Sequence, residues 1–331
     1  MRAVRLVDAH RLEPVDLPDP EPSEGEVVVQ VNSCGVCGSD LSSYKVGLFT
    51  DSVPGHEISG TVAAVGPGAG RWRVGERTVV DPKLPCGVCD ECAAGTPWRC
   101  AFALTAGLGF ARNGGFAEQV LAPAHLLHRI PEDLPLEAAC LVEPLSVALH
   151  GVVRAGEVSG PAVVVGLGPI GLFTVAALRS RGVEDVVGVD PVADRRRLAS
   201  VLGAAQTVAD IAEVRSLIAP AQAVFECSGV PTLLHRAADL VAPGGVLVLL
   251  GVPFGEATVL PLMWVTREIA ILGSIASSEA DFRDAISMLS ADPGLSAVVT
   301  RRAGLSEVPA LFEELIAPSS GAKAVVDPAR L

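Results

Sequence analysis

The 331-residue sequence lacks several features that mark common protein classes. Its eight cysteines are too dilute for a small disulfide-stabilised scaffold. Its net charge of −13 leaves no basic excess for a general nucleic-acid-binding surface. Only 19% of the residues are charged and 50% are hydrophobic, which excludes disorder as the main state. We therefore expect a folded protein with an ample core and no nucleic-acid partner.

We expect neither an export signal nor a membrane-spanning segment in this sequence. Its first residues carry scattered charges and no apolar signal-peptide core. The stretch 158–178 has no charge and is long enough to span a bilayer. It contains six glycine and proline residues, however, which fit a buried strand, a turn and a helix better. We expect a soluble, cytoplasmic protein without a membrane partner, in which clustered cysteines bind metal rather than form disulfides.

The hydrophobic pattern changes along the chain. Short apolar runs between turn-forming residues predict strands at 27–31, 59–66 and 76–82. From about residue 146, apolar strands alternate with helices, as is typical of a doubly wound parallel sheet. Mixed elements return after about residue 291. The predicted fold class is therefore α/β.

A glycine-rich turn follows the first strand of the alternating region. Its G-x-G-x-x-G sequence lies between an apolar strand and an apolar helix. The first glycine allows the tight turn, the second lets backbone approach a pyrophosphate, and the third packs helix against strand. Free N–H groups at the helix start then bind phosphate. The predicted dinucleotide-binding residues of this turn are Gly166, Gly168, Pro169, Ile170 and Gly171.

An acidic residue, Asp190, ends the next predicted strand, 19 residues after Gly171. A carboxylate there accepts hydrogen bonds from the adenosine ribose and repels a 2′-phosphate, which favours NAD over NADP. Three arginines follow from Arg195, and such a basic cluster could tolerate NADP. We favour a solvated helix start at which Arg195 lies near the adenine.

Four cysteines lie within one short segment. Their C-x2-C-x2-C-x7-C spacing lets four thiolates surround one ion tetrahedrally. The spacing lacks the usual ferredoxin ending, and a reducing compartment disfavours disulfides. We predict a structural zinc lobe over 85–101 whose ligands are Cys86, Cys89, Cys92 and Cys100.

The remaining motifs, taken with the glycine turn and the cysteine lobe, resemble one family. Cys37 lies in G-V-C-G-S-D, His56 and Glu57 lie in G-H-E, and Glu143 begins E-P-L-S. In this order they resemble the zinc-dependent medium-chain dehydrogenases/reductases over essentially the whole chain. The Glu-Pro pair resembles the sorbitol and threonine dehydrogenase branch.

The resemblance implies a two-domain architecture. A GroES-like catalytic domain would comprise 1–145 and 291–331, interrupted by a Rossmann NAD-binding domain at 146–290. The active site would lie in the cleft between the two domains. Relatives of this kind are dimers or tetramers, so a homodimer or homotetramer is expected.

The resemblance also assigns a catalytic zinc. Cys37 and His56 would bind it, with Glu57 or Glu143 as the third protein ligand. Asp40 would orient the ligand histidine. Together with the cysteine lobe, this predicts two zinc ions per chain.

Further roles follow from the resemblance. Ser39 would hydrogen-bond the substrate alcohol and begin a proton relay. Many relatives have a histidine where this chain has Ser42, which cannot act as a base near pH 7, so the route of proton exit stays open between Ser42 with water, Glu57 and bulk solvent. Residues expected beside the nicotinamide are Cys227, Gly251 and Ser274, and those expected beside the substrate are Tyr44, Phe110 and Arg302.

These motifs predict a zinc-dependent oxidoreductase that transfers a hydride between a secondary alcohol and NAD, giving a ketone. The alcohol would be a polyol, an amino alcohol or an aminocyclitol, and the run C-G-S-D-L-S resembles 2-deoxy-scyllo-inosamine dehydrogenases. One alternative is an NADP-linked reductase of a ketone, imine or unsaturated substrate. Another is a non-catalytic NAD-binding protein.

Overall fold

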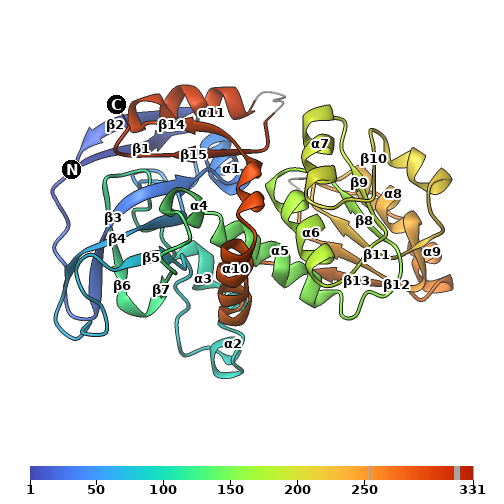
Figure 1. Ribbon diagram of the computed structural model, residues 1–331, viewed down its shortest axis with the longest axis horizontal. Coiled ribbons are helices and arrows are strands. Elements are labelled where there is room, and N and C mark those ends of the chain that lie inside the picture. The colour runs from blue at the N-terminus through green and yellow to red at the C-terminus, as the bar shows by residue number, and fades with distance from the viewer. Residues whose placement is uncertain (253–254, 317–320, 331) are drawn as a thin grey trace. The chain divides into compact units, whose positions relative to one another are not determined.

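The structure, a computed structural model, forms two compact units (Figure 1). The first contains residues 1–143 and most of the described chain from residue 278 onward, and the second contains residues 144–277 with 321–322. The first unit contains a seven-stranded sheet and the two-stranded sheet β1-β2, the second contains a six-stranded sheet, and each unit has its own hydrophobic core. The described residues are 1–252, 255–316 and 321–330.

The sheet of the first unit is built around β3 (Glu26–Gly35), a valine-rich strand that is buried along most of its length. β3 pairs antiparallel with β4 (Glu57–Val65) on one side, and with β6 (Gln119–Pro123) and β15 (Lys323–Val326) on the other. Because β15 is the last strand and pairs with β3, the C-terminal part of the chain belongs to this sheet. The other strands of the unit are β1 (Arg2–Asp8), β2 (Arg11–Asp16), β5 (Arg77–Val80), β7 (Leu127–Arg129) and β14 (Val299–Ala303).

Helices of the first unit are few, and most are short. α1 (Gly38–Val46) directly follows β3, and Asp40 in its first turn accepts a hydrogen bond from the Cys37 N–H as part of a capping box. The other helices are α2 (Asp90–Ala93), α3 (Phe102–Thr105), α4 (Leu136–Ala139), α10 (Glu279–Ala291), α11 (Val308–Ile316), and the 3₁₀ helices η1 (Pro97–Arg99), η2 (Ala124–Leu126), η4 (Pro293–Val298) and η5 (Leu305–Glu307).

The second unit is a six-stranded sheet in which every pair is parallel, with the order β10-β9-β8-β11-β12-β13. The order reverses between β8 and β11, which is the topological switch point of a doubly wound fold. This confirms the predicted α/β class. The strands are β8 (Ala162–Val165), β9 (Val186–Val189), β10 (Gln206–Val208), β11 (Ala221–Glu226), β12 (Val241–Leu249) and β13 (Ala270–Gly273).

Helices cover both faces of this sheet: α6 lies on one side and α8 on the other (Figure 1). The uncharged stretch 158–178 forms β8, the glycine turn and most of α6, as predicted. Within the described residues, no helix is both long enough and apolar enough to cross a membrane. The helices are α5 (Val142–Arg154), α6 (Pro169–Ser180), α7 (Ala193–Val201), α8 (Leu233–Leu240), α9 (Pro261–Thr266) and the 3₁₀ helix η3 (Ile211–Ser216).

The helix α10 lies in the first unit, whereas the predicted boundary at residue 290 assigned it to the Rossmann domain. Its Phe282 is fully buried, with its ring centroid 4.7 Å from that of His128 on β7. The Lys83 amine lies 5.7 Å from the same ring. Phe282 therefore belongs to the β-rich unit, and the boundary falls near residue 277 instead. Part of the predicted 291–331 segment (317–320 and 331) lies outside the described residues.

Candidate functional site

Three of the predicted metal ligands come together in the first unit. Cys37, His56 and Glu57 each present a ligand atom, and these atoms all lie within 4.8 Å of one another. Cys37 precedes α1, and the other two lie at the start of β4. Gly55 makes this approach possible, because it has a φ of +92° and an added Cβ would lie 2.7 Å from the Cys34 Sγ.

Asp40 holds this arrangement together. One of its oxygens accepts a hydrogen bond from the Cys37 N–H at 2.9 Å, and the other lies 3.4 Å from His56 Nδ1. With Nδ1 toward Asp40, the imidazole would offer Nε2 to a metal. Burial opposes protonation of His56, but the negative charges of Asp40 and Cys37 outweigh it and raise the pKa of His56 well above its usual value.

Sequence reasoning missed Lys323, which joins the same centre. Its amine donates to a carboxylate oxygen of Glu57 and, at 2.8 Å, to the Val36 carbonyl. Glu57 and Lys323 are at most 1% exposed, so this is a buried ion pair. Burial disfavours the charged amine, but Glu57 outweighs it and raises the pKa of Lys323. An added Cβ at Gly35 would lie 1.8 Å from Glu57 Oε2, so the pair also requires that glycine.

The donor set fits a zinc ion. The second carboxylate oxygen of Glu57 is buried and has no hydrogen-bond partner in the described part of the chain. A thiolate, an imidazole and a carboxylate are the ligands that zinc takes in proteins. A cation between them would satisfy the unpartnered oxygen.

Glu143, the other candidate for the third ligand, lies in the first turn of α5. Burial and the neighbouring Glu57 raise its pKa to about 7, although His56 lowers it. Among the described residues, the three-residue ligand group does not include Glu143. The geometry thus favours Glu57 over Glu143.

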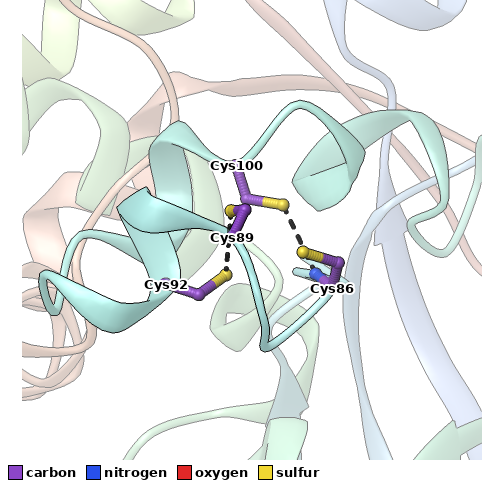
Figure 2. Close-up of side chains that lie close together, drawn as sticks. All are labelled: Cys86, Cys89, Cys92 and Cys100. Atoms are coloured by element: carbon purple, nitrogen blue, oxygen red, sulfur yellow. Dashed lines mark hydrogen bonds between the residues drawn. The ribbon is translucent and has the colours of Figure 1, made fainter.

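The four cysteines of the lobe surround one point. Their sulfur atoms lie within 4.8 Å of one another, and Figure 2 shows them facing inward from α2 and the adjoining turns. Backbone N–H groups of Val88 and Cys89 lower the pKa of Cys86 to about 6, which favours its thiolate. Burial and hydrogen bonding to Cys89 raise the pKa of Cys92 to about 11. All four are free thiols, and four convergent sulfurs fit a closed tetrahedral zinc site.

The glycine turn of the second unit has the geometry of a phosphate site. Gly166 has a φ of +89°, and an added Cβ at Gly171 would lie 1.8 Å from the Gly166 carbonyl oxygen. Gly168 is the N-cap of α6 and Pro169 is its first residue, and no side chain caps this helix. The first N–H groups of α6 are thus available to an anion.

Asp190 lies just after β9, with only 4% of its side chain exposed. Its carboxylate accepts hydrogen bonds from the N–H groups of Leu167 and Val192, each at 2.8 Å. Arg195 lies 3.6 Å from the same carboxylate and donates to the Gly321 carbonyl at 3.0 Å. Asp190 thereby ties the glycine turn to the end of the neighbouring strand.

Four of the predicted site residues carry a hydroxyl or a thiol. Ser39 Oγ and Ser274 Oγ are buried and have no hydrogen-bond partner among the residues that the structure describes. Ser42 lies one turn after Ser39 on α1. Cys227 Sγ lies 3.8 Å from Thr174 Oγ1, and burial raises the pKa of this thiol.

The three residues predicted to lie beside the substrate have different surroundings in the structure. The Phe110 ring stacks on that of His56, with 4.8 Å between centroids, and thus borders the metal centre. Tyr44 is buried and donates a hydrogen bond to Glu313 on α11. Arg302 donates weakly to the Glu137 carbonyl at 3.4–3.5 Å. These contacts of Tyr44 with the hydrophobic core and with α11 argue against the substrate role predicted for it.

Comparisons with known proteins identify the family of the chain. Residues 23–132 match the family model of the alcohol dehydrogenase GroES-like domain, and residues 169–291 match that of the zinc-binding dehydrogenases. The chain is 32% identical to a D-altritol 5-dehydrogenase of Agrobacterium fabrum over 94% of this chain and 95% of that protein. It is 38% identical to a (R,R)-butanediol dehydrogenase of Saccharomyces cerevisiae over 57% of each chain.

Solved structures are similar over nearly the whole chain. A zinc-binding dehydrogenase of Sinorhizobium meliloti bound to NADP has a TM-score of 0.91 and 31% identity, with 99% of each chain covered. An alcohol dehydrogenase of Escherichia coli complexed with NADH also has a TM-score of 0.91, with 27% identity and the same coverage.

Proposed function

The chain belongs to the zinc-dependent medium-chain dehydrogenases/reductases, and on this premise we propose that it oxidises a secondary alcohol to a ketone, with NAD as the hydride acceptor. The observation that carries the proposal is the convergence of Cys37, His56 and Glu57 around one point. It is supported by the buried hydroxyl of Ser39, two residues after Cys37, which has no hydrogen-bond partner among the described residues. A protein that only bound a dinucleotide would not need these buried donors.

Each side chain has a role in this reaction. Cys37, His56 and Glu57 would hold the catalytic zinc, and Asp40 would fix the imidazole through Nδ1. A zinc ion held there would supply Lewis-acid chemistry that lowers the pKa of an alcohol, and a bound nicotinamide would supply the hydride acceptor. Ser39 would accept the substrate hydroxyl proton in a hydrogen bond.

We propose that Ser42 takes part in proton exit, with Glu57 and bulk solvent as the alternative routes. Ser42 has no group that titrates near pH 7, so it can pass a proton only as a member of a hydrogen-bond chain with water. Phe110 covers one face of the His56 ring and limits the access of water to it. The apolar cover strengthens electrostatic interactions in the centre.

The lobe cysteines would bind a second, structural zinc, giving two ions per chain. Within the described residues this ligand group consists of four sulfurs, which would fill all four positions of a tetrahedral ion and leave none open for substrate. We infer that this ion stabilises the segment 85–101 and takes no part in catalysis.

NAD is proposed over NADP because the buried Asp190 carboxylate lies where the adenosine ribose would bind. A second candidate function, an NADP-linked reductase, is favoured by Arg195 beside that carboxylate and by the NADP bound in the Sinorhizobium relative. The ratio of kcat/KM for the two cofactors distinguishes these functions.

The substrate class is proposed to be polyols or related diols and amino alcohols. The relatives that cover the chain include D-altritol 5-dehydrogenase and D-xylulose reductase, which are named for polyol and ketose substrates. A screen of NAD⁺ reduction over polyols, vicinal diols, threonine-like amino alcohols and aminocyclitols tests this proposal. We expect turnover with at least one class and none with Cys37→Ala, and the absence of turnover with every class would refute it.

We also propose that the chain forms a homo-oligomer. β13 ends the sheet order of the second unit, so one of its edges is unpaired within the described residues. Exposed apolar side chains lie on the preceding helix α9, including Leu262 and Val265 at 63% and 74% exposure. Light scattering in solution should give a mass of two or four chains.

A further inference from the structure

Glu226 is a buried acid at the centre of the second sheet. It is the last residue of β11, the strand that lies next to β8, and it is only 4% exposed. Among the described residues no lysine, arginine or histidine forms an ion pair with it. A charged side chain in such a position is costly unless hydrogen bonds satisfy it.

The donors that satisfy Glu226 all belong to the turn that follows it. One carboxylate oxygen accepts the N–H of Ser228 at 2.8 Å and also its hydroxyl, and the other accepts the N–H of Gly229 at 3.2 Å. The Ser228 hydroxyl oxygen in turn accepts the N–H of Val230 at 3.1 Å. The carboxylate therefore shapes the turn 227–230 and has little capacity left for a ligand.

This turn is in close contact with glycines on both sides. An added Cβ at Gly166 would lie 2.7 Å from Ser228 N, and an added Cβ at Gly251 would lie 2.2 Å from Gly229 N. The first glycine belongs to the turn after β8, and the second follows β12. A shift of the turn 227–230 would therefore collide with backbone on either side.

The sheet order shows which half of a dinucleotide this turn would meet. Asp190 follows β9, which lies on one side of β8, and Glu226 ends β11 on the other side. A pyrophosphate at the glycine turn after β8, with the adenosine ribose at Asp190, directs the other half of the molecule toward β11. The turn 227–230 thus borders the nicotinamide half.

We propose that Glu226 is a positioning residue for the nicotinamide half of the dinucleotide site, which it serves by holding the turn 227–230 against Gly166 and Gly251. The inference rests on the proposed dinucleotide function. Glu226 itself touches neither cofactor nor substrate. Its effect should therefore appear only with ligands that carry the nicotinamide half.

The test compares the affinities of two ligands. NADH carries both halves, whereas ADP-ribose carries the adenosine half and the pyrophosphate alone. Glu226→Gln keeps the shape but turns an amide NH₂ toward one of the donors. We expect the Kd of NADH to rise about tenfold, as for loss of one charged hydrogen bond, and the Kd of ADP-ribose to stay within about twofold of wild type.

Two further variants serve as controls. Glu184→Gln changes an exposed carboxylate of the same unit and should alter neither Kd. Asp190→Asn should weaken the binding of NADH and of ADP-ribose to a similar extent. If Glu226→Gln folds poorly, Ser228→Ala removes one of the three donors and should raise the Kd of NADH alone, by a smaller factor.

An equal loss of affinity for NADH and for ADP-ribose in Glu226→Gln, or no loss of affinity for either ligand, would overturn the inference. A wild-type protein that binds neither NADH nor ADP-ribose, nor their 2′-phosphorylated counterparts, would instead refute the dinucleotide function itself.

Discussion

At the scale of single residues, the metal centre depends on a charge pair between distant parts of the chain. Lys323 and Glu57 are 266 residues apart in sequence, yet the amine donates directly to the carboxylate. Cys37, His56 and Glu57 could be predicted because they occur in short motifs. Nothing local to Lys323 marks it, since its partner is set by the pairing of β15 with β3.

Replacement of Lys323 by Met should strongly destabilise the protein. The carboxylate of Glu57 would stay buried without its cation, which costs about 3–5 kcal/mol of unfolding free energy. Denaturant unfolding measures the loss. Lys45→Met, at an exposed lysine of α1, is the matched control and should change little. Glu57→Gln combined with Lys323→Met should recover much of the loss, and a single variant as stable as Lys45→Met would contradict the account.

Asp190 should set cofactor preference. Asp190→Ala removes the charge that repels a 2′-phosphate, so the ratio of kcat/KM for NAD to that for NADP should fall about tenfold. Both values will also fall, because the carboxylate holds Leu167 and Val192. The control is Asp194→Ala, which breaks only an exposed pair with Arg197. An unchanged ratio in Asp190→Ala would show that Asp190 does not select the cofactor.

At the scale of elements, helices and strands that are marked by local sequence signals could be predicted. The elements against which they pack could not. β8, the glycine turn and α6 were predicted together, because strand, turn and helix signals adjoin within one apolar stretch. α10 has an equally clear apolar face, but periodicity does not say which core that face joins. Its assignment needed the contact of Phe282 with His128. The contact of Tyr44 with Glu313 could not be predicted for a similar reason, since α11 lies far from Tyr44 in sequence.

The packing of α10 on β7 should make stability sensitive to acid. Burial lowers the pKa of His128 below its usual 6.5, so the unfolded chain takes up a proton more readily than the folded one. The contribution of His128 to the free energy of unfolding is fully present above pH 6.5. It is lost as the pH falls through the pKa of His128 in the folded protein, by at most about 1.4 kcal/mol per pH unit.

Thermal unfolding between pH 8 and pH 5 tests this dependence. His128→Phe should reduce the acid-induced fall in Tm, because a neutral ring replaces the imidazole beside Phe282. His125→Phe, at an exposed neighbour, should leave the fall as in wild type. Identical pH profiles for all three proteins would assign the acid sensitivity to other groups.

At the scale of the whole molecule, the cysteines divide by position. Four form the lobe, Cys37 joins His56 and Glu57, and Cys34 is a buried thiol a few residues away from Cys37. The spacing within the lobe is local, so it could be predicted from the sequence alone. The group of Cys37, His56 and Glu57 forms only when the starts of α1 and β4 come together in the fold. Its prediction from the sequence therefore relied on resemblance to a family.

The zinc content of the purified chain tests the central claim most directly. Elemental analysis should find two zinc ions per wild-type chain and one in Cys37→Ala, which should also lose alcohol-dependent NAD⁺ reduction. Cys34→Ala, a matched change at a buried neighbouring thiol, should keep both ions and its activity. A single zinc ion in the wild type, or two ions and full turnover in Cys37→Ala, would contradict the account.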